Sequence, residues 1–208
     1  MKRRTWLAGS AAMITPGISD PGQTQLRLKI SLDPQNPGAS RGVCPDLIEG
    51  DFPVGFGKHG LKAKGEAFEG GYSLLGDFVV NAILSVDRFE MKESLIRESG
   101  KSKKWLKEHL FANMSSIDFD LDGRAGEYGI GFLGLEPLDQ SVRQPFHFGE
   151  YKGVFRWYSY AVHGTQNESR IGQKITGGCV NVSEAPLRKL IAGMQLGDGV
   201  RVDAVLPA

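Results

Sequence analysis

Short runs in which apolar and polar residues alternate account for most of the chain. The clearest run follows a turn-like SDPGQ segment, where Leu26, Leu28, Ile30 and Leu32 alternate with polar residues. Alternation with a period of two is typical of a strand with one buried face. The same alternation, or an apolar run of strand length, recurs at residues 51–60, 78–86, 117–121, 155–162 and 200–204. The pattern therefore predicts a chain built mainly of short strands.

Two segments have helical spacing instead. The first, Met91–Asn113, is rich in Lys and Glu, and its apolar residues recur every three to four positions: Leu95, Ile96, Trp105, Leu106, Leu110 and Phe111. Because Gly100 divides this segment, one or two short amphipathic helices with a solvated lysine face are expected. The second segment lies near the C-terminus. There Ser183 is placed to cap a helix whose apolar stripe is Leu187, Leu190 and Ile191.

The order of these elements predicts the domain organisation. No internal repeat is evident, and the 28 glycines and 10 prolines are spread along the chain rather than collected in one tract. We expect a single, mainly β domain over residues 24–206, with a helical insertion at about 91–113 and a short C-terminal helix before the final strand.

Composition narrows the classes of function. The chain has 208 residues, 40% of them hydrophobic, which is enough for one domain with a full core. Its net charge of +1 gives no reason to expect a nucleic-acid partner or a polybasic membrane patch. No apolar run approaches the roughly 20 residues that span a bilayer, so no integral membrane segment is expected.

The N-terminus resembles a twin-arginine export signal. Lys2, Arg3 and Arg4 precede a short apolar and small-residue stretch from Trp6 to Ile14. No A-x-A cleavage site follows, and the alternative is a basic cytoplasmic terminus. We expect residues 1–20 to be an export signal or a disordered N-terminus, which makes the expected location periplasmic or otherwise extracytoplasmic.

The richest chemistry lies in HGTQNESRIGQKITGGCVNV, residues 163–182. A cysteine becomes a nucleophile as its thiolate, and an imidazole within reach of it accepts the proton. Glycines beside Cys179 let main-chain N–H groups approach an oxyanion, and the helix expected beyond it could turn its N-terminus toward the site. Spacing alone leaves a buried thiol and a turn histidine as the alternative. Two candidate ligands without a third do not make a metal site, and Cys44, before a proline, is expected to be a buried small residue.

The order of these residues resembles the signature of the L,D-transpeptidase catalytic domain family, the cysteine peptidoglycan transpeptidases. His163-Gly164-Thr165 is followed, after a loop containing Ile171-Gly172, by the residues Thr176 to Asn181. The family has a histidine, Gly or Ser, a variable loop, then Ser/Thr-x-Gly-Cys-hydrophobic-Asn/Arg. The x position, often His or Arg in the family, is Gly177 here. Lys64–Phe78 and the closing GDGVRV are weaker matches.

The resemblance implies a β-sandwich or mixed-sheet fold and a role for each matching residue. Cys179 would be the nucleophile, His163 the general base, and the carbonyl of Gly164 the group that orients the imidazole. The N–H groups of Gly178, Cys179 and Gly177 are the expected oxyanion donors. Three further residues would brace the site or contact substrate: Thr176, Asn181 and Tyr160. Tyr160 is equally well placed to be a core residue.

The implied activity is that of a peptidoglycan L,D-transpeptidase, which forms cross-links through a cysteine acyl-enzyme on tetrapeptide stems and releases D-alanine. Such an enzyme acts in cell-wall biogenesis and cell shape, is a carbapenem target and requires no cofactor or metal. Its partners would be peptidoglycan stem peptides. The alternatives are an L,D-carboxypeptidase that hydrolyses the same bond, and a non-catalytic cell-wall-binding domain of the same fold. A papain-like protease is disfavoured because its cysteine precedes its histidine, whereas here the histidine comes first.

Overall fold

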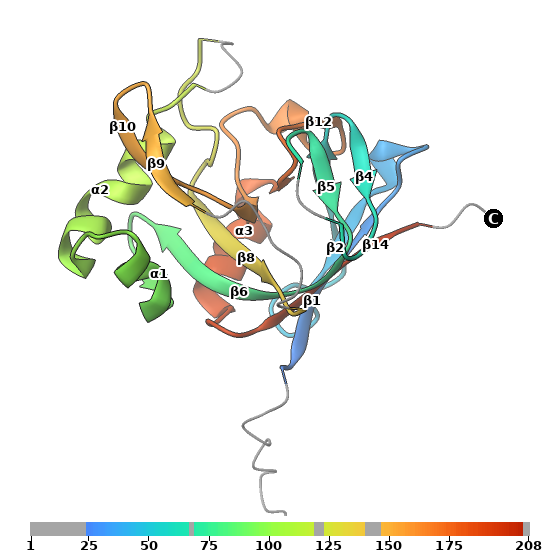
Figure 1. The fold of residues 1–208 in the computed structure, drawn as a ribbon. Coiled ribbons are helices and arrows are strands. Elements are labelled where there is room, and N and C mark those ends of the chain that lie inside the picture. Colours follow the sequence, from blue (N-terminus) through green and yellow to red (C-terminus); the bar gives the residue numbers. More distant parts are fainter. Residues whose placement is uncertain (1–23, 67–68, 119–122, 140–146, 206–208) are drawn as a thin grey trace, which may run out of the picture.

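A computed structural model describes residues 24–66, 69–118, 123–139 and 147–205. The export-like residues 1–20 lie outside the described part. Most described elements are strands (Figure 1). The largest sheet is mixed, with parallel and antiparallel neighbours. Its strands, in spatial order, are β12 (Lys174–Thr176), β3 (Asp51–Gly57), β13 (Val180–Val182), β11 (Tyr160–His163), β8 (Gly131–Pro137), β6 (Gly76–Ser85), β14 (Gly199–Ala204), β1 (Leu26–Leu32) and β2 (Arg41–Val43), with β7 (Phe89–Met91) paired to β6. The mainly β class and the mixed sheet expected from the sequence are confirmed.

The main sheet closes on itself, because β2 pairs with both β1 and β3. Alternate residues of its strands form one hydrophobic cluster on the inner face, and α3 (Glu184–Gly193) packs into the same cluster. Leu28, Ile30 and Leu32 on β1 are all buried there, as their alternation predicts. Full closure protects the strand edges and gives the inner face a continuous core.

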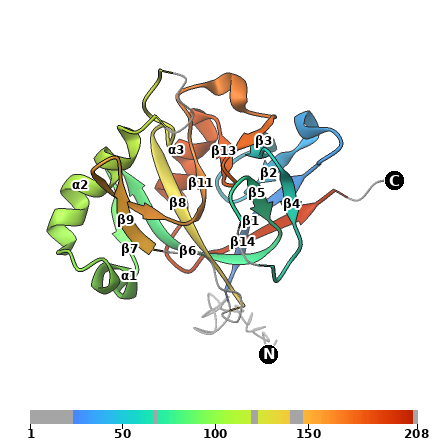
Figure 2. The same cartoon turned by 45° about the horizontal axis from the view of Figure 1, so that its top comes forward.

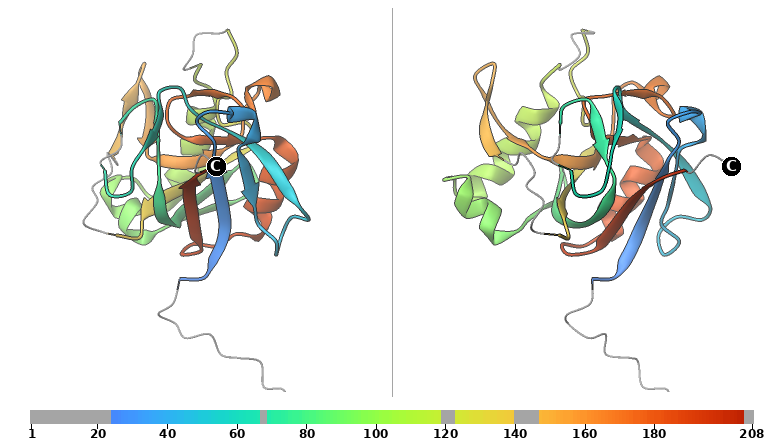
Figure 3. Two further views of the ribbon diagram at one scale, coloured as in Figure 1. Left: turned by 90° about the vertical axis from the view of Figure 1, so that its right-hand side faces the viewer. Right: turned by 45° about the vertical axis from the view of Figure 1, so that its right-hand side comes forward.

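Two smaller strand pairs lie beside this sheet, and only the first packs with the outer cluster (Figure 2). One is the antiparallel hairpin of β9 (His147–Tyr151) and β10 (Val154–Tyr158). Its two-residue turn has Lys152 at φ 51° and Gly153 at φ 77°, the left-handed pair that a tight hairpin needs. The other is the parallel pair of β4 (Gly60–Lys62) and β5 (Tyr72–Leu74). The β9–β10 hairpin lies on one side of the molecule and α3 on the other (Figure 3).

The single alternating run expected over 155–162 is in fact two strands. β10 and β11 belong to different sheets, and the extended run is interrupted between them at Ser159. Alternation predicted which side chains share a face but not this change of partner, which is decided by contacts distant in sequence. The run at 117–121 is also corrected, because Ile117 and Asp118 carry no strand; residues 119–122 lie outside the described part.

The two helices expected around Gly100 are confirmed. They are α1 (Glu93–Glu98) and α2 (Lys103–Ser115), and Gly100 between them has a φ of 65°. The Ser102 side chain caps α2 by accepting from the Trp105 N–H at 3.1 Å. The helices join the hairpin in a second hydrophobic cluster on the outer face, which includes Leu106, Leu110 and Trp157. Two short 3-10 turns complete the described elements, η1 (Pro37–Ala39) and η2 (Glu168–Arg170).

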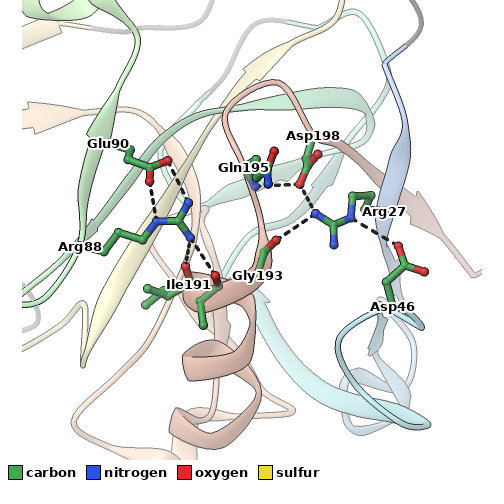
Figure 4. A network of polar contacts seen from close by, with 9 residues as sticks. Arg27, Asp46, Arg88, Glu90, Ile191, Gly193, Gln195 and Asp198 are labelled. Carbon is green, nitrogen blue, oxygen red and sulfur yellow. Dashed lines mark hydrogen bonds and ion pairs between the residues drawn. The ribbon is translucent and has the colours of Figure 1, made fainter. Parts of the chain in front are cut away.

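The C-terminal end of α3 is held by two arginines, one on β1 and one in the turn between β6 and β7 (Figure 4). Arg88 donates to the carbonyls of Ile191 and Ala192, and Arg27 donates to the carbonyl of Gly193 at 3.0 Å. The last carbonyls of a helix have no partner within it, and cations there also favour the helix dipole. These contacts fix α3 against the sheet, and with it the segment that precedes α3.

Candidate active site

The candidate site lies where two strands run side by side. β11 and β13 are parallel, with Val162 opposite Val180 and His163 opposite Asn181. Val162 and Val180 belong to the inner cluster, whereas Ala161 and Cys179 pack with the outer one. Because side chains alternate along a strand, His163 shares the outer face with Cys179, diagonally across the strand pair. Cys179 lies two positions before the residue opposite His163, directly before β13.

His163 is held with one ring nitrogen fixed. Its Nδ1 lies 2.6 Å from the carbonyl of Gly164, so Nδ1 donates its proton there and Nε2 is left as the acceptor. The Tyr128 ring packs on the imidazole with centroids 4.8 Å apart. Burial lowers the pKa of His163 to about 4. Hydrogen bonds to the carbonyls of Gly164 and Glu127 act in the opposite direction, because they favour the charged form. The imidazole is therefore neutral near pH 7, the state a general base requires.

Cys179 is half-buried and its thiol is neutral at rest. Sγ donates to the Ser159 carbonyl at 3.6 Å, at the break between β10 and β11. Burial raises the pKa of Cys179 to about 12, although the Ala161 N–H and the charge of Arg156 both favour the thiolate. The thiol must therefore lose its proton during attack rather than before it, which calls for a neutral base nearby.

The glycine loop before the cysteine is braced by hydroxyls. Thr176 Oγ1 donates to the Cys179 carbonyl at 2.5 Å and accepts from the Gly178 N–H at 3.2 Å. Ser73, from β5, donates to the Gly178 carbonyl at 2.6 Å. Gly178 has a φ of 127°, a conformation that favours glycine. The loop is thus held in one shape by groups distant in sequence.

These hydrogen bonds distinguish the three N–H groups that are expected to donate to an oxyanion. The N–H of Gly178 already donates to Thr176 Oγ1. For the N–H groups of Gly177 and Cys179, the described part of the chain offers no acceptor within hydrogen-bond distance. A Cβ built on Gly177 would meet nothing within 4 Å, so this position faces open space. Of the three N–H groups, those of Gly177 and Cys179 are the ones without an acceptor in the described part of the chain.

Asn181 is buried instead of reaching into solvent, and its Oδ1 has no hydrogen-bond partner within the described part of the chain. It is 1% exposed and lies opposite Gly55 on β3. A Cβ on Gly55 would sit 2.1 Å from Asn181 Oδ1 and 2.7 Å from the Arg170 carbonyl. The glycine at 55 therefore makes the space that the amide occupies. Thr176, 3% exposed, is also buried, and its hydroxyl braces the glycine loop.

Two expectations about the site are corrected. Tyr160 is 1% exposed and belongs to the inner cluster, where its hydroxyl donates to the Leu74 carbonyl at 3.1 Å. An offset of three residues from His163 puts it on the opposite face of the strand, so its side chain packs in the core, the alternative that the sequence left open. The N-terminus of α3 is separated from Cys179 by β13, and the Glu184 N–H donates to Glu168 at 2.8 Å. Ser183 occupies the N-cap position without a capping side-chain bond.

Sequence reasoning missed three residues that shape the site. Ser73 links the glycine loop to β3, since it also accepts from the Gly57 N–H at 2.9 Å. Glu127 and Arg170 form a buried ion pair near His163. Ser73 lies in residues 64–78, which weakly match the family's sequence, but that match assigned Ser73 no role. Nothing in the sequence indicated the ion pair of Glu127 and Arg170, because charged residues in loops are usually solvated.

Within the described ranges, no three His, Cys, Asp or Glu side chains converge to hold a metal ion. None of the helices described is both long and apolar enough to cross a membrane.

Comparison with known proteins gives structural likeness at low identity. No protein-family model and no curated protein matches the chain. The solved structures to which it is similar include L,D-transpeptidases. One from Mycobacterium tuberculosis H37Rv has 10% identity and a TM-score of 0.42, covering 85% of this chain and 57% of that one. One from Mycobacterium smegmatis has 14% identity and a TM-score of 0.37, covering 86% and 59%. One from Xylanimonas cellulosilytica has 15% identity and a TM-score of 0.36, covering 88% and 62%.

This chain thus spans less than two thirds of the length of those structures. At such identities and TM-scores the likeness assigns no residue a role. The roles proposed below rest on the geometry of the site.

Proposed function

We propose that the protein is a cysteine acyltransferase of the L,D-transpeptidase kind. The observation that carries this proposal is the pairing of a neutral imidazole with a thiol on one sheet face. His163 Nδ1 is fixed by Gly164, and Cys179 follows a braced glycine loop on the neighbouring strand. The family resemblance of residues 160–182 supplies the reaction, and we take residues 24–206, with the insertion at 91–113, as the catalytic unit.

The first step is acylation of Cys179. His163 Nε2 takes the proton from Sγ as sulfur bonds to the carbonyl carbon of the L-to-D peptide bond. The N–H groups of Gly177 and Cys179 stabilise the oxyanion that forms. When the C–N bond breaks, His163 returns the proton to the amine of the leaving D-alanine. The product is a thioester of Cys179 with the shortened stem.

The second step resolves the thioester. An amine of a neighbouring stem attacks its carbonyl, the new amide bond forms as the C–S bond breaks, and the amine's proton passes through His163 to the departing sulfur. The result is a cross-link, the reaction of cell-wall biogenesis. Water in place of the amine makes the same site an L,D-carboxypeptidase. Peptidoglycan stems lie outside the cytoplasm, which agrees with the export-like N-terminus and places the proposed site of action in the periplasm or its equivalent.

A direct assay tests this function. Purified full-length protein is incubated with a disaccharide-tetrapeptide, and D-alanine release and dimer formation are followed by mass spectrometry. Transpeptidation predicts both products, and carboxypeptidase activity predicts D-alanine without dimer. A Cys179→Ala variant should yield neither. A non-catalytic wall-binding domain would retain the tetrapeptide unchanged, and D-alanine release by the Ala variant would refute the assignment of the nucleophile.

Carbapenem trapping gives a second readout of the nucleophile. We expect a single covalent adduct on Cys179, located by peptide mapping. Cys44 is a matched control within the chain because it is fully buried, and burial raises the pKa of its thiol. An adduct on Cys44 alone would contradict the assignment.

A further inference from the structure

Glu127 and Arg170 form a buried ion pair beside the candidate base. Glu127 Oε2 and Arg170 Nη1 lie 2.5 Å apart, and the two side chains are 9% and 8% exposed. Desolvating two charges is costly, so a buried pair is weak evidence of stabilisation and calls for another explanation. The mechanism described above uses neither residue.

Glu127 lies in a tight turn that packs directly against His163 and Gly164. The ring of Tyr128, the next residue, lies 4.8 Å from the imidazole, and the Tyr128 carbonyl accepts from the Gly164 N–H at 3.1 Å. A Cβ on Gly129 would sit 2.6 Å from the Thr165 nitrogen, so the two segments are in backbone contact. The position of this turn therefore sets the surroundings of the imidazole.

Arg170 lies in the loop that joins the candidate base to the candidate nucleophile. It ends η2, where its N–H donates to the Asn167 carbonyl at 3.0 Å and its own carbonyl accepts from the Gln173 N–H at 3.2 Å. The guanidinium reaches from this fixed backbone to Glu127. The ion pair therefore clamps the turn at 126–129 to the loop at 164–173.

The pair also sets charge near the imidazole. Arg170 and Glu127 act on His163 from the loop and the turn, Tyr128 covers the ring, and Cys179 precedes the neighbouring strand β13. Burial is the larger cause of the lowered pKa of His163, and the positive charge of Arg170 lowers that pKa further. Removing Arg170 takes a positive charge away from the imidazole and removing Glu127 takes a negative one away, so the two changes should have opposite effects on it.

We propose that Glu127 and Arg170 are positioning residues for His163: their ion pair fixes the turn and the loop that hold the imidazole between Tyr128 and Gly164, and the positive charge of Arg170 favours its neutral, proton-accepting form. The role for His163 rests on the proposed function, but the pair acts on the imidazole whether or not a peptidoglycan substrate is turned over.

The test is the titration of His163 in the purified full-length protein, followed by NMR of its imidazole and assigned with a His163→Gln variant. Arg170→Gln leaves a buried carboxylate, so the titration midpoint should rise by about one pH unit. Glu127→Gln leaves a buried cation, so the midpoint should fall. Arg170→Lys keeps the charge and should leave the midpoint within a few tenths of a unit. Shifts of opposite sign are what a merely structural role would not produce.

An exposed ion pair of the same length supplies the matched control. Arg188 and Glu184 lie 2.5 Å apart on α3 with side chains 64% and 57% exposed, and Arg188→Gln should not move the His163 midpoint. Circular dichroism shows which variants fold, and if Arg170→Gln does not, Glu127→Gln and Arg170→Lys decide the question.

Equal midpoints in Glu127→Gln and the unmodified protein, or shifts of one sign in both charge-removing variants, overturn the proposal. Failure of D-alanine release with the expected titration shifts would instead refute the proposed function and leave the clamp standing.

Discussion

The two faces of β11 and β13 are built from the same two strands and differ in what they bury. On the inner face, Tyr160, Val162, Val180 and Val182 are at most 1% exposed and pack into the cluster that includes α3. On the outer face, His163 and Asn181 are also buried, at 8% and 1%. One face therefore buries side chains that gain from leaving water, and the other buries polar groups that lose by it.

The difference shows how the molecule divides stability from chemistry. Each buried apolar side chain on the inner face contributes roughly 1.5–3 kcal/mol relative to exposure. That surplus can hold an imidazole and a thiol in a dry environment, where both stay neutral. The comparison is useful because each face predicts a different phenotype when it is altered.

The largest expected effect is on the outer face. Cys179→Ala should lower the rate of D-alanine release by about 10³-fold or more, because no other group can form the thioester. Its thermal unfolding should change little, since a half-buried thiol is replaced by a methyl group. The measurement is single-turnover release beside differential scanning calorimetry. A large loss of stability in Cys179→Ala would contradict the assignment of chemistry to the outer face and stability to the inner face.

His163→Gln should lower the same rate by about 10²–10⁴-fold, the usual contribution of a positioned base. Glutamine fills similar space and can still donate toward the Gly164 carbonyl, so the variant is expected to fold. Alkylation of Cys179 by iodoacetamide should also slow. Unchanged kinetics in both assays would mean that the two residues do not act as a pair.

The buried imidazole should also make stability depend on pH. The folded pKa of His163 is about 4, below its ordinary value of 6.5, so only the unfolded state binds a proton between these values. The free energy of unfolding should therefore fall by about 3 kcal/mol as pH drops from 6.5 to 4. Denaturant titrations across this range measure the fall. His163→Gln should lack this contribution, and an equal slope in that variant would assign it to other groups.

On the inner face, Tyr160→Phe should cost about 1–3 kcal/mol of stability, because the Leu74 carbonyl loses its hydroxyl donor. The folded variant should release D-alanine at the normal rate. Urea titration and the product assay together check this. If Tyr160→Phe is stable but releases D-alanine slowly, Tyr160 contributes to the active site as well as to the core.

The smallest effect is expected at Gly177. Its Cβ direction is open, so Gly177→Arg should change stability by less than about 0.5 kcal/mol. Gly178→Ala is the matched control: at a φ of 127° a side chain is strained, and the variant should be clearly less stable. Thermal melts of the two variants compare the positions directly. Equal losses would show that the loop responds to any side chain.

Alternation predicted the strands well because it records which residues leave water, a local property of the sequence. It identified Leu28, Ile30 and Leu32 as a buried face and placed Val200 and Val202 on the final strand. It failed at Ser159, where the chain continues in extended form but changes sheet. It left Tyr160 open between the site and the core, and the offset of three residues from His163 decides for the core.

The sequence by itself determined the mainly β class, the two helical segments and the pairing of His163 with Cys179 as candidates. These depend on periodicity and on residue types whose chemistry is intrinsic. Only the tertiary structure decided that Ser73 braces the glycine loop, that the Gly178 N–H is occupied and that Glu127 meets Arg170. Each of these contacts joins residues far apart in the chain or depends on the shape of a loop. Such contacts follow from how the sheet closes, and no local pattern encodes them.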